Sequence, residues 1–221
     1  MPILVKICGI DGTEAADAAL RAGADFAGLV FHAGSPRNLT LDRARPLAER
    51  MRGRLRLVAL LADAGDEEIG AVVEAVRPDF VQLHGGESAE RVGAVRARFA
   101  VAVIKAVAVA DESDLASAAR YETVADMLLF DAKAPKNAAR PGGHGAAFDW
   151  QLLRGRRFSR PWLLAGGLTP ANVARAVATS GAAGVDVSSG VETAPGRKSA
   201  TLIDEFVSAA RAAQFAAEAR T

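Results

Sequence analysis

Eight short apolar runs, spaced almost evenly along the chain, limit the fold more than any other feature of the sequence. Each run spans seven to nine residues, and most are rich in Val, Leu and Ile. The runs begin at Ile3, Asp25, Leu55, Asp79, Ala102, Asp126, Pro161 and Gly184. The first and last starts lie 184 − 3 = 181 residues apart, so the seven intervals average about 26 residues, roughly one strand and one helix with short loops. Most runs are too short for helices and too continuously apolar for half-solvated strands, which predicts parallel strands covered on both faces.

Amphipathic patterns predict a helix in most of the intervals between these runs. The predicted helices cover residues 13–22, 41–51, 66–76, 88–99, 112–121, 170–178 and 200 to about 219. Most of them begin with a side chain that can accept hydrogen bonds from the first turn. These capping residues are Thr13, Thr40, Asp66, Ser88, Asp111 and Thr169, with Pro170 suited to the first helical position.

The alternation of strands and helices predicts a single-domain (β/α)8 TIM barrel with parallel strands over residues 1–221, near the lower size limit of that fold. The alternative is an open, doubly wound sheet, which usually carries G-x-G-x-x-G after its first strand. This chain has CGIDGTE there instead. Two irregular stretches interrupt the alternation, residues 132–147 and 190–198. The first is long enough to close over a site, and the second lies where barrels often bind phosphate.

The charge balance and the single cysteine exclude several kinds of partner and site. The chain has 27 basic and 26 acidic residues, a net charge of +1, and its basic residues are scattered, so we expect no nucleic-acid partner. Cys8 is the only cysteine, which excludes an intrachain disulfide and a multi-thiolate metal site and favours a reducing, cytoplasmic location. No apolar window reaches the roughly 18 residues of a membrane span, and the N-terminus lacks a signal-peptide pattern, so we expect no membrane partner.

In a barrel of this kind, catalytic groups lie at the C-terminal ends of the strands. Lys6 and Cys8 alternate in the first run and so share one face. The ammonium can favour the thiolate, although a single cysteine is more often a small buried hydrophobe. Asp131 ends an apolar run, where a carboxyl group can serve as an acid or simply cap a loop. Gln82 and His84 alternate in the fourth run, where an imidazole is more often structural.

Two glycine-rich strand ends predict a phosphate site. Gly166 and Gly167 follow the seventh run and precede the helix expected at Thr169, so backbone N–H groups can face an anion beside a positive helix end. Each loop alone is more often a turn, but two of them on the last two strands are typical of phosphate sites in barrels. The second loop consists of Ser188, Ser189 and Gly190.

Two further residues complete the candidate site. Arg37, in AGSPRNL after the second run, offers a guanidinium fork for a carboxylate, or forms an exposed salt bridge. We also expect Asp186, in the last run, to be a substrate-binding residue. Taken together, the residues predict acid–base chemistry on a phosphorylated small molecule, with no cofactor and no metal. Two alternatives stay open, a non-catalytic phosphate-binding barrel and a lyase that forms a Schiff base. The candidate lysines for the lyase are Lys6, Lys105 and Lys133.

Motifs at the predicted strand ends follow one another in order along nearly the whole chain. They are VKICGI from Val5, SPRNL around Arg37, VQLHGGES from Val81, VIKAV from Val103, LLFDAK from Leu128, LAGGLTPANV from Leu164 and GVDVSSGVE from Gly184. In this order they resemble the phosphoribosylanthranilate isomerase family of tryptophan biosynthesis. The resemblance implies a cofactor-free Amadori rearrangement of N-(5-phosphoribosyl)anthranilate by acid–base catalysis.

The resemblance also implies roles for single residues. Asp131 would protonate the furanose ring oxygen, Cys8 would remove the proton from C2 of the sugar, and Arg37 would hold the anthranilate carboxylate. The phosphate would be bound by Gly166, Gly167, Ser188, Ser189 and Gly190. Lys6, His84 and Asp186 are expected to be substrate-binding residues. The related isomerase of histidine biosynthesis is disfavoured, because the resemblance implies that this enzyme has a carboxylate at the position where this chain has Cys8. We expect a monomer or a homodimer.

Overall fold

The computed structural model describes residues 2–133 and 147–218. Within them, eight strands close into a barrel in sequential order, and every neighbouring pair in it is parallel. The strands are β1 (Leu4–Cys8), β2 (Phe26–Val30), β3 (Arg56–Leu61), β4 (Phe80–Leu83), β5 (Ala102–Val109), β6 (Met127–Ala132), β7 (Trp162–Leu164) and β8 (Gly184–Val187). Each lies in one of the predicted apolar runs, so the predicted (β/α)8 barrel is confirmed.

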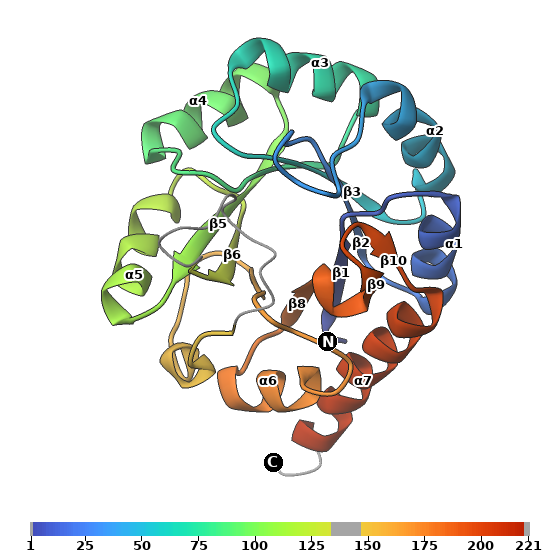
Figure 1. Ribbon diagram of the computed structural model, residues 1–221. Helices are drawn as coiled ribbons and strands as arrows, with labels where there is room; N and C mark the ends of the chain where they lie inside the picture. The colour runs from blue at the N-terminus through green and yellow to red at the C-terminus, as the bar shows by residue number, and fades with distance from the viewer. Residues whose placement is uncertain (1, 134–146, 219–221) are drawn as a thin grey trace.

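The helices form an outer ring around the strands (Figure 1). They are α1 (Thr13–Ala22), α2 (Leu41–Met51), α3 (Asp66–Val76), α4 (Ala89–Phe99), α5 (Glu112–Ala116), α6 (Val173–Ser180) and α7 (Ala200–Glu218), with the 3₁₀ helices η1 (Ser117–Tyr121), η2 (Trp150–Leu153) and η3 (Ser189–Val191). The first three match the predicted bounds. The helix predicted over 112–121 instead splits into α5 and η1. None of the helices described combines the length and the apolar character needed to cross a bilayer.

Three of the predicted helix caps are confirmed, and three are wrong. Thr40, Ser88 and Asp111 accept hydrogen bonds from the first turns of α2, α4 and α5. Helices α1 and α3 begin one residue after extended glycines, Gly12 and Gly65, without a side-chain cap. The predicted caps Thr13 and Asp66 are therefore already the first residues of their helices.

The third wrong cap is Thr169, and Pro170 does not begin a helix. Helix α6 starts only at Val173, after Asn172. The Asn172 side chain accepts a hydrogen bond from the Thr169 N–H at 2.8 Å. It also donates to the Gly167 carbonyl at 2.9 Å. The asparagine thus stabilises a turn between the glycine pair and the helix, which moves the helix start away from β7.

Alternate strand residues fill the interior of the barrel. An apolar cluster inside it consists of Phe26, Val58, Ile104, Ala106, Met127, Leu129, Leu163 and Ala165, with Leu4 and Phe80 packed against it. The other strand residues pack outwards against the helices in a larger cluster. Side chains in a strand alternate with a period of two, so the inward face continues as polar residues towards the C-terminal ends. These inward residues are Lys6 and Cys8 of β1, Gln82 and His84 along β4 and its end, and Asp131 of β6.

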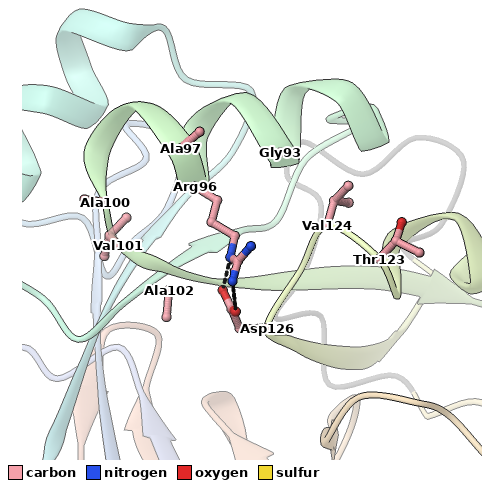
Figure 2. A pocket seen from close by; sticks show the side chains of 9 residues that line it. All are labelled: Gly93, Arg96, Ala97, Ala100, Val101, Ala102, Thr123, Val124 and Asp126. Atoms are coloured by element: carbon pink, nitrogen blue, oxygen red, sulfur yellow. Dashed lines mark hydrogen bonds and ion pairs between the residues drawn. The ribbon is translucent and has the colours of Figure 1, made fainter.

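At the N-terminal end of the barrel, three aspartates each bind the backbone of the preceding strand. Asp25, Asp79 and Asp126 begin three of the apolar runs, and a carboxylate oxygen of each accepts a backbone hydrogen bond. The donors are the N–H groups of Val5, Leu57 and Val103, at 2.7, 2.6 and 2.9 Å. Figure 2 shows Asp126 paired with Arg96 beside an open groove of about 430 Å³ between α4 and the start of β5.

The two irregular stretches have different outcomes. Residues 190–198 contain a two-stranded antiparallel hairpin, β9 (Glu192–Ala194) and β10 (Arg197–Lys198), between η3 and α7. The other stretch, 132–147, was predicted to be long enough to cover a site. Residues 134–146 of it lie outside the described part of the chain, so that prediction is not tested.

Candidate active site

Lys6 and Cys8 lie side by side inside the barrel. The Lys6 ammonium is fully buried and donates to Asp186 Oδ1 at 2.7 Å, because β1 and β8 are paired in a register that places these two residues opposite each other. Gly28 of β2 leaves room for both side chains. A Cβ atom at this position would lie 3.0 Å from Cys8 Sγ and 3.3 Å from Lys6 Nζ. The predicted shared face of Lys6 and Cys8 is therefore present.

Burial has the largest effect on the electrostatics of Cys8. Burial raises the pKa of the thiol, and Lys6 opposes this without overcoming it. Asp186 raises that pKa further, and Lys198 lowers it. Burial alone would lower the pKa of Lys6, but Asp186 and Cys8 bring it above its ordinary value. Lys6 therefore favours the thiolate, as expected, but desolvation is the larger effect, and the pKa of the thiol stays above its ordinary value.

On the other side of the barrel mouth, Asp131 ends a row of three hydrogen-bonded side chains. Gln82 Nε2 lies 2.7 Å from His84 Nδ1, and His84 Nε2 lies 3.2 Å from Asp131 Oδ2. The other carboxylate oxygen, Asp131 Oδ1, accepts from the N–H of Ala132 at 2.8 Å. His84 thus contacts the candidate acid directly.

A cavity opens beside this carboxylate. It has a volume of about 190 Å³ and lies at the C-terminal ends of β2 to β6. Its lining residues are His32, Ala62, Asp63, His84, Gly85, Gly86, Ala106, Ala108 and Asp131. A bound molecule can therefore reach Asp131 from the barrel mouth.

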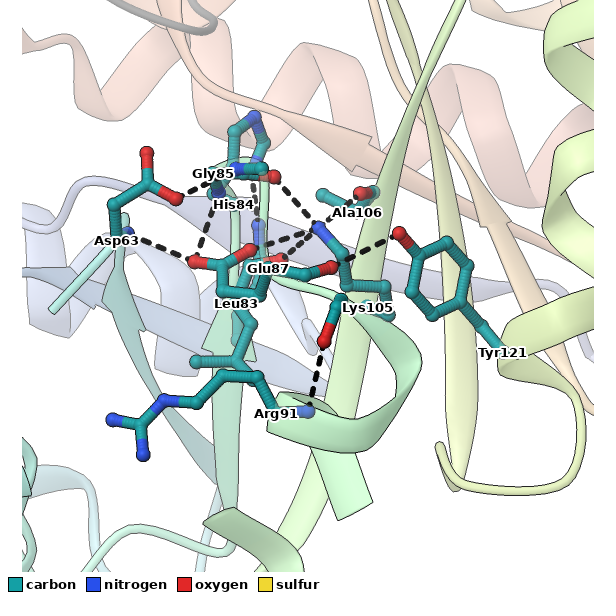
Figure 3. A network of polar contacts seen from close by, with 12 residues as sticks. Asp63, Leu83, His84, Gly85, Glu87, Arg91, Lys105, Ala106 and Tyr121 are labelled. Atoms are coloured by element: carbon teal, nitrogen blue, oxygen red, sulfur yellow. Dashed lines mark hydrogen bonds and ion pairs between the residues drawn. The ribbon is translucent and has the colours of Figure 1, made fainter. Parts of the chain in front are cut away.

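The segment that carries His84 is held by a buried ion pair (Figure 3). Lys105 Nζ donates to Glu87 Oε2 at 2.9 Å and lies within 3.2 Å of the carbonyls of Leu83, Gly85 and Ala106. Glu87 Oε1 in turn accepts from the N–H groups of Asp63 and Gly85. Burial lowers the pKa of Lys105 although Glu87 opposes it. These contacts occupy Lys105 fully, so it is poorly placed to attack a carbonyl.

Arg37 lies in a buried pair rather than in the exposed salt bridge that the sequence allowed. Its Nε and Nη2 donate to the two oxygens of Glu192 at 2.6 and 2.7 Å, and only 5% of the Arg37 side chain is exposed. Lys198 Nζ donates to the same carboxylate at 2.7 Å and to the Ser188 carbonyl at 2.9 Å. Burial lowers the pKa of Lys198 against the opposing effect of Glu192. A guanidinium has five N–H donors, and Glu192 takes two of them.

Glu192 and Lys198 were not among the predicted site residues. The signal available in the sequence was their place in the irregular stretch 190–198, directly after the last strand. Because Glu192 accepts from both Arg37 and Lys198, the pKa of its carboxyl stays below the ordinary value although burial alone would raise it. This triad links the β9–β10 hairpin to the loop after β2.

The two loops predicted to bind phosphate touch each other. Gly166 and Gly167 have positive φ angles of 87° and 64°, and Gly190 packs so closely that a Cβ atom there would lie 1.8 Å from the Leu168 carbonyl oxygen. Ser188 Oγ lies 3.3 Å from Lys198 Nζ, which puts a cation beside these loops. The sequence predicted that the positive end of a helix follows the glycine pair directly. This prediction is wrong, because α6 begins only at Val173.

Across residues 2–133 and 147–218, no three His, Cys, Asp or Glu side chains are grouped so that they could hold a metal ion. The polar groups described at the barrel mouth include paired cations and carboxylates, the Cys8 thiol and the imidazoles of His32 and His84.

Comparison with known proteins gives consistent matches. Residues 5–209 match the family model described as N-(5'-phosphoribosyl)anthranilate (PRA) isomerase. N-(5'-phosphoribosyl)anthranilate isomerase of Paramagnetospirillum magneticum is 53% identical over 96% of this chain and 98% of its own length. The enzyme of the same name from Rhodopseudomonas palustris (strain BisA53) is 52% identical over 97% of this chain and 98% of its own.

Solved structures that are similar to this chain carry the same enzyme name. Phosphoribosyl anthranilate isomerase from Thermotoga maritima is similar with a TM-score of 0.83 and 35% identity, over 95% of this chain and 99% of that one. A phosphoribosyl anthranilate isomerase in complex with reduced 1-(o-carboxyphenylamino)-1-deoxyribulose 5-phosphate is similar with a TM-score of 0.82 and 34% identity, over the same shares of the two chains.

Proposed function

The chain belongs to the N-(5'-phosphoribosyl)anthranilate isomerase family, and we propose that Cys8 and Asp131 are the general base and the general acid of its reaction. The protein is an isomerase of tryptophan biosynthesis that converts N-(5-phosphoribosyl)anthranilate into 1-(2-carboxyphenylamino)-1-deoxyribulose 5-phosphate. This activity decides against the phosphate-binding barrel and the Schiff-base lyase. The observation that carries the proposal is that Cys8 and Asp131 both end inward faces of parallel strands at the same end of the barrel.

The acid acts first. Asp131 protonates the furanose ring oxygen, the ring opens, and C1 becomes an iminium carbon joined to the anthranilate nitrogen. Asp131 Oδ1 accepts from the Ala132 N–H and Oδ2 contacts His84 Nε2, and we assign delivery of the proton to Oδ2. Asp131 lines the cavity at the barrel mouth.

The base acts on the opened sugar. Cys8 removes the proton from C2, which the neighbouring iminium has made acidic, and a neutral enolamine forms. Burial raises the pKa of the thiol, so the thiolate, once formed, binds a proton strongly and is an effective base. Lys6 and Lys198 both favour this thiolate electrostatically.

The enolamine then becomes the ketone product. The C2 hydroxyl loses its proton and C1 gains one, so C2 is oxidised and C1 is reduced within the same molecule. One proton enters at the ring oxygen and one leaves from C2, so no electron acceptor or donor is required. The chemistry therefore needs only acid and base groups in fixed positions.

The remaining predicted residues hold the substrate. We assign the phosphate to the two touching loops, Gly166–Gly167 and Ser188 to Gly190, beside Lys198. Arg37 keeps donors for the anthranilate carboxylate beyond the two that Glu192 takes. Lys6 and Asp186 are paired with each other. We expect them to act on the substrate indirectly, through their effect on the pKa of Cys8.

Assembly and location stay predictions. The Thermotoga maritima enzyme among the similar solved structures is described as dimeric, which supports a homodimer here, with a monomer as the alternative. A cytoplasmic location agrees with a biosynthetic role and a single reduced cysteine.

The acid and base assignments are tested with two variants. Cys8→Ala and Asp131→Asn should each fold normally and lose at least about 10²-fold in kcat, the low end for removal of a general acid or base. Turnover is followed by the loss of fluorescence of freshly prepared phosphoribosylanthranilate. The matched control is Asp126→Asn, an identical change at the opposite end of the barrel, which should leave kcat unchanged. Near-normal turnover in either test variant removes that residue from its assigned role.

A further inference from the structure

The row of Gln82, His84 and Asp131 contains an unexplained polar atom. Gln82 is fully buried, and its Oε1 has no hydrogen-bond partner among the residues that the structure describes. A buried amide oxygen without a partner is costly, and its presence in a native fold calls for an explanation. The other half of the same amide, Nε2, lies 2.7 Å from His84 Nδ1.

The contacts define one protonation state of the row. An amide NH2 only donates, so His84 Nδ1 accepts, and in a neutral imidazole the hydrogen then sits on Nε2. Nε2 therefore donates to Asp131 Oδ2 across 3.2 Å, and both oxygens of Asp131 then accept hydrogen bonds. In this state Asp131 carries no proton to donate.

Adding one proton to the row changes what Gln82 must do. With hydrogens on both ring nitrogens, Nδ1–H would face the NH2 of Gln82, and two donors would oppose each other. A half-turn of the amide about its last bond brings Oε1 to Nδ1 instead. The unpartnered oxygen is then the acceptor for Nδ1–H in the protonated state of the row.

We propose that Gln82 is a positioning residue that sets whether the His84–Asp131 pair holds the proton that Asp131 delivers. The proposal rests on the proposed role of Asp131 as the general acid. In the delivery step, the Nε2–H bond of His84 breaks as the Oδ2–H bond forms, and the Oδ2–H bond breaks as the new bond to the ring oxygen forms. The pair regains one proton from the C2 hydroxyl when the enolamine becomes the ketone, so the protons balance over one turnover.

Charged groups around the row are paired or bound to the backbone. Glu87 and Lys105 form the buried pair behind His84, and Asp63 Oδ1 accepts from the Gly86 N–H. Lys133, after β6, is paired with Asp114. His32 lines the same cavity. It is the group that has to be controlled in a pH experiment.

Two variants of Gln82 separate the proposal from a purely structural role. In Gln82→Glu the introduced carboxylate accepts from Nδ1–H and favours the doubly protonated ring, so the basic limb of the kcat profile should move to higher pH by about one unit. In Gln82→Met, which is close in shape, nothing accepts from Nδ1–H, and the limb should move to lower pH by a similar amount. Both profiles are measured in a His32→Gln background. Shifts in the same direction, or no shift, overturn the proposal.

A measurement on the unsubstituted protein covers the case in which a Gln82 variant does not fold. The chain has three histidines, so ¹⁵N-histidine labelling with replacement of the other two assigns His84. The neutral ring should carry its hydrogen on Nε2 at high pH. In Gln82→Glu it should carry it on Nδ1. A neutral ring with its hydrogen on Nδ1 in the unsubstituted protein overturns the proposal.

Failure of the proposal differs from failure of the acid assignment. If Asp131→Asn retains turnover, Asp131 is not the acid, and the proposal fails with that assignment. If Asp131→Asn loses turnover while the two Gln82 variants shift together, Asp131 remains the acid and only the role of Gln82 is wrong.

Discussion

The two ends of the barrel use charge in opposite ways. At the N-terminal end, Asp25, Asp79 and Asp126 accept hydrogen bonds from backbone N–H groups of neighbouring strands. At the C-terminal end, buried charged side chains bind one another, as in Lys6–Asp186 and Lys105–Glu87. The first arrangement satisfies the backbone where the strands begin. The second removes several charges from water, which costs free energy unless each charge finds a partner.

This difference indicates that the fold accepts a lower stability at the C-terminal end of the barrel, where the proposed chemistry takes place. Apolar residues of similar volume often serve a fold as well as a buried ion pair, so stability alone does not explain the pairs. Lys6 adjusts the electrostatics of Cys8, and Lys105 holds the segment that carries His84. In the proposed mechanism, the buried charges at the C-terminal end position or tune the groups assigned as acid and base, and variants at the two ends should separate loss of stability from loss of activity.

The largest effect on stability should come from breaking a buried pair at the C-terminal end. Lys105→Met leaves Glu87 without its cation, and the free energy of unfolding should fall by about 3–5 kcal/mol. The double variant Lys105→Met with Glu87→Gln should lose less, because no charge is left unpaired. Urea denaturation of both proteins measures the difference. A single variant as stable as the double one would mean that the pair does not hold this segment.

The next effect should appear in substrate binding. Arg37→Ala removes the guanidinium proposed to contact the anthranilate carboxylate, so KM should rise at least about tenfold, roughly the value of one charged hydrogen bond. The effect on kcat should be much smaller. Steady-state kinetics by the fluorescence assay give both constants. An unchanged KM would place the carboxylate elsewhere and leave Arg37 with only its structural pair to Glu192.

The sequence predicts the strands and the positions of the proposed acid and base well, for a simple reason. In a parallel barrel, the strand period of two and the common direction of the strands determine which residues face inwards at which end. This is why Cys8 and Asp131, from strands far apart in the sequence, were expected at the same mouth.

The partners of the buried charges could not be predicted in the same way. Arg37 and Glu192 are 155 residues apart, and nothing in either local pattern points to the other. The missed helix starts have a local reason, since Gly12 and Gly65 take extended conformations directly before the helices. The net rise in the pKa of Cys8 was not predicted, because a strand pattern shows which cation is near but not how completely the sulfur is removed from water.

The smallest effect should come from the N-terminal end and should be confined to stability. Asp126→Ala removes the acceptor of the Val103 N–H and the partner of Arg96, so the free energy of unfolding should fall by about 1 kcal/mol. Asp126→Asn keeps an oxygen for the Val103 N–H and loses only the exposed ion pair, which contributes little, so it should lie between the alanine variant and the unsubstituted protein. Both variants should retain kcat and KM, since the groove of Figure 2 lies away from the barrel mouth. If either one lowered kcat several-fold at a temperature where it is fully folded, the two ends of the barrel would be coupled, and the separation of stability from chemistry drawn above would not hold.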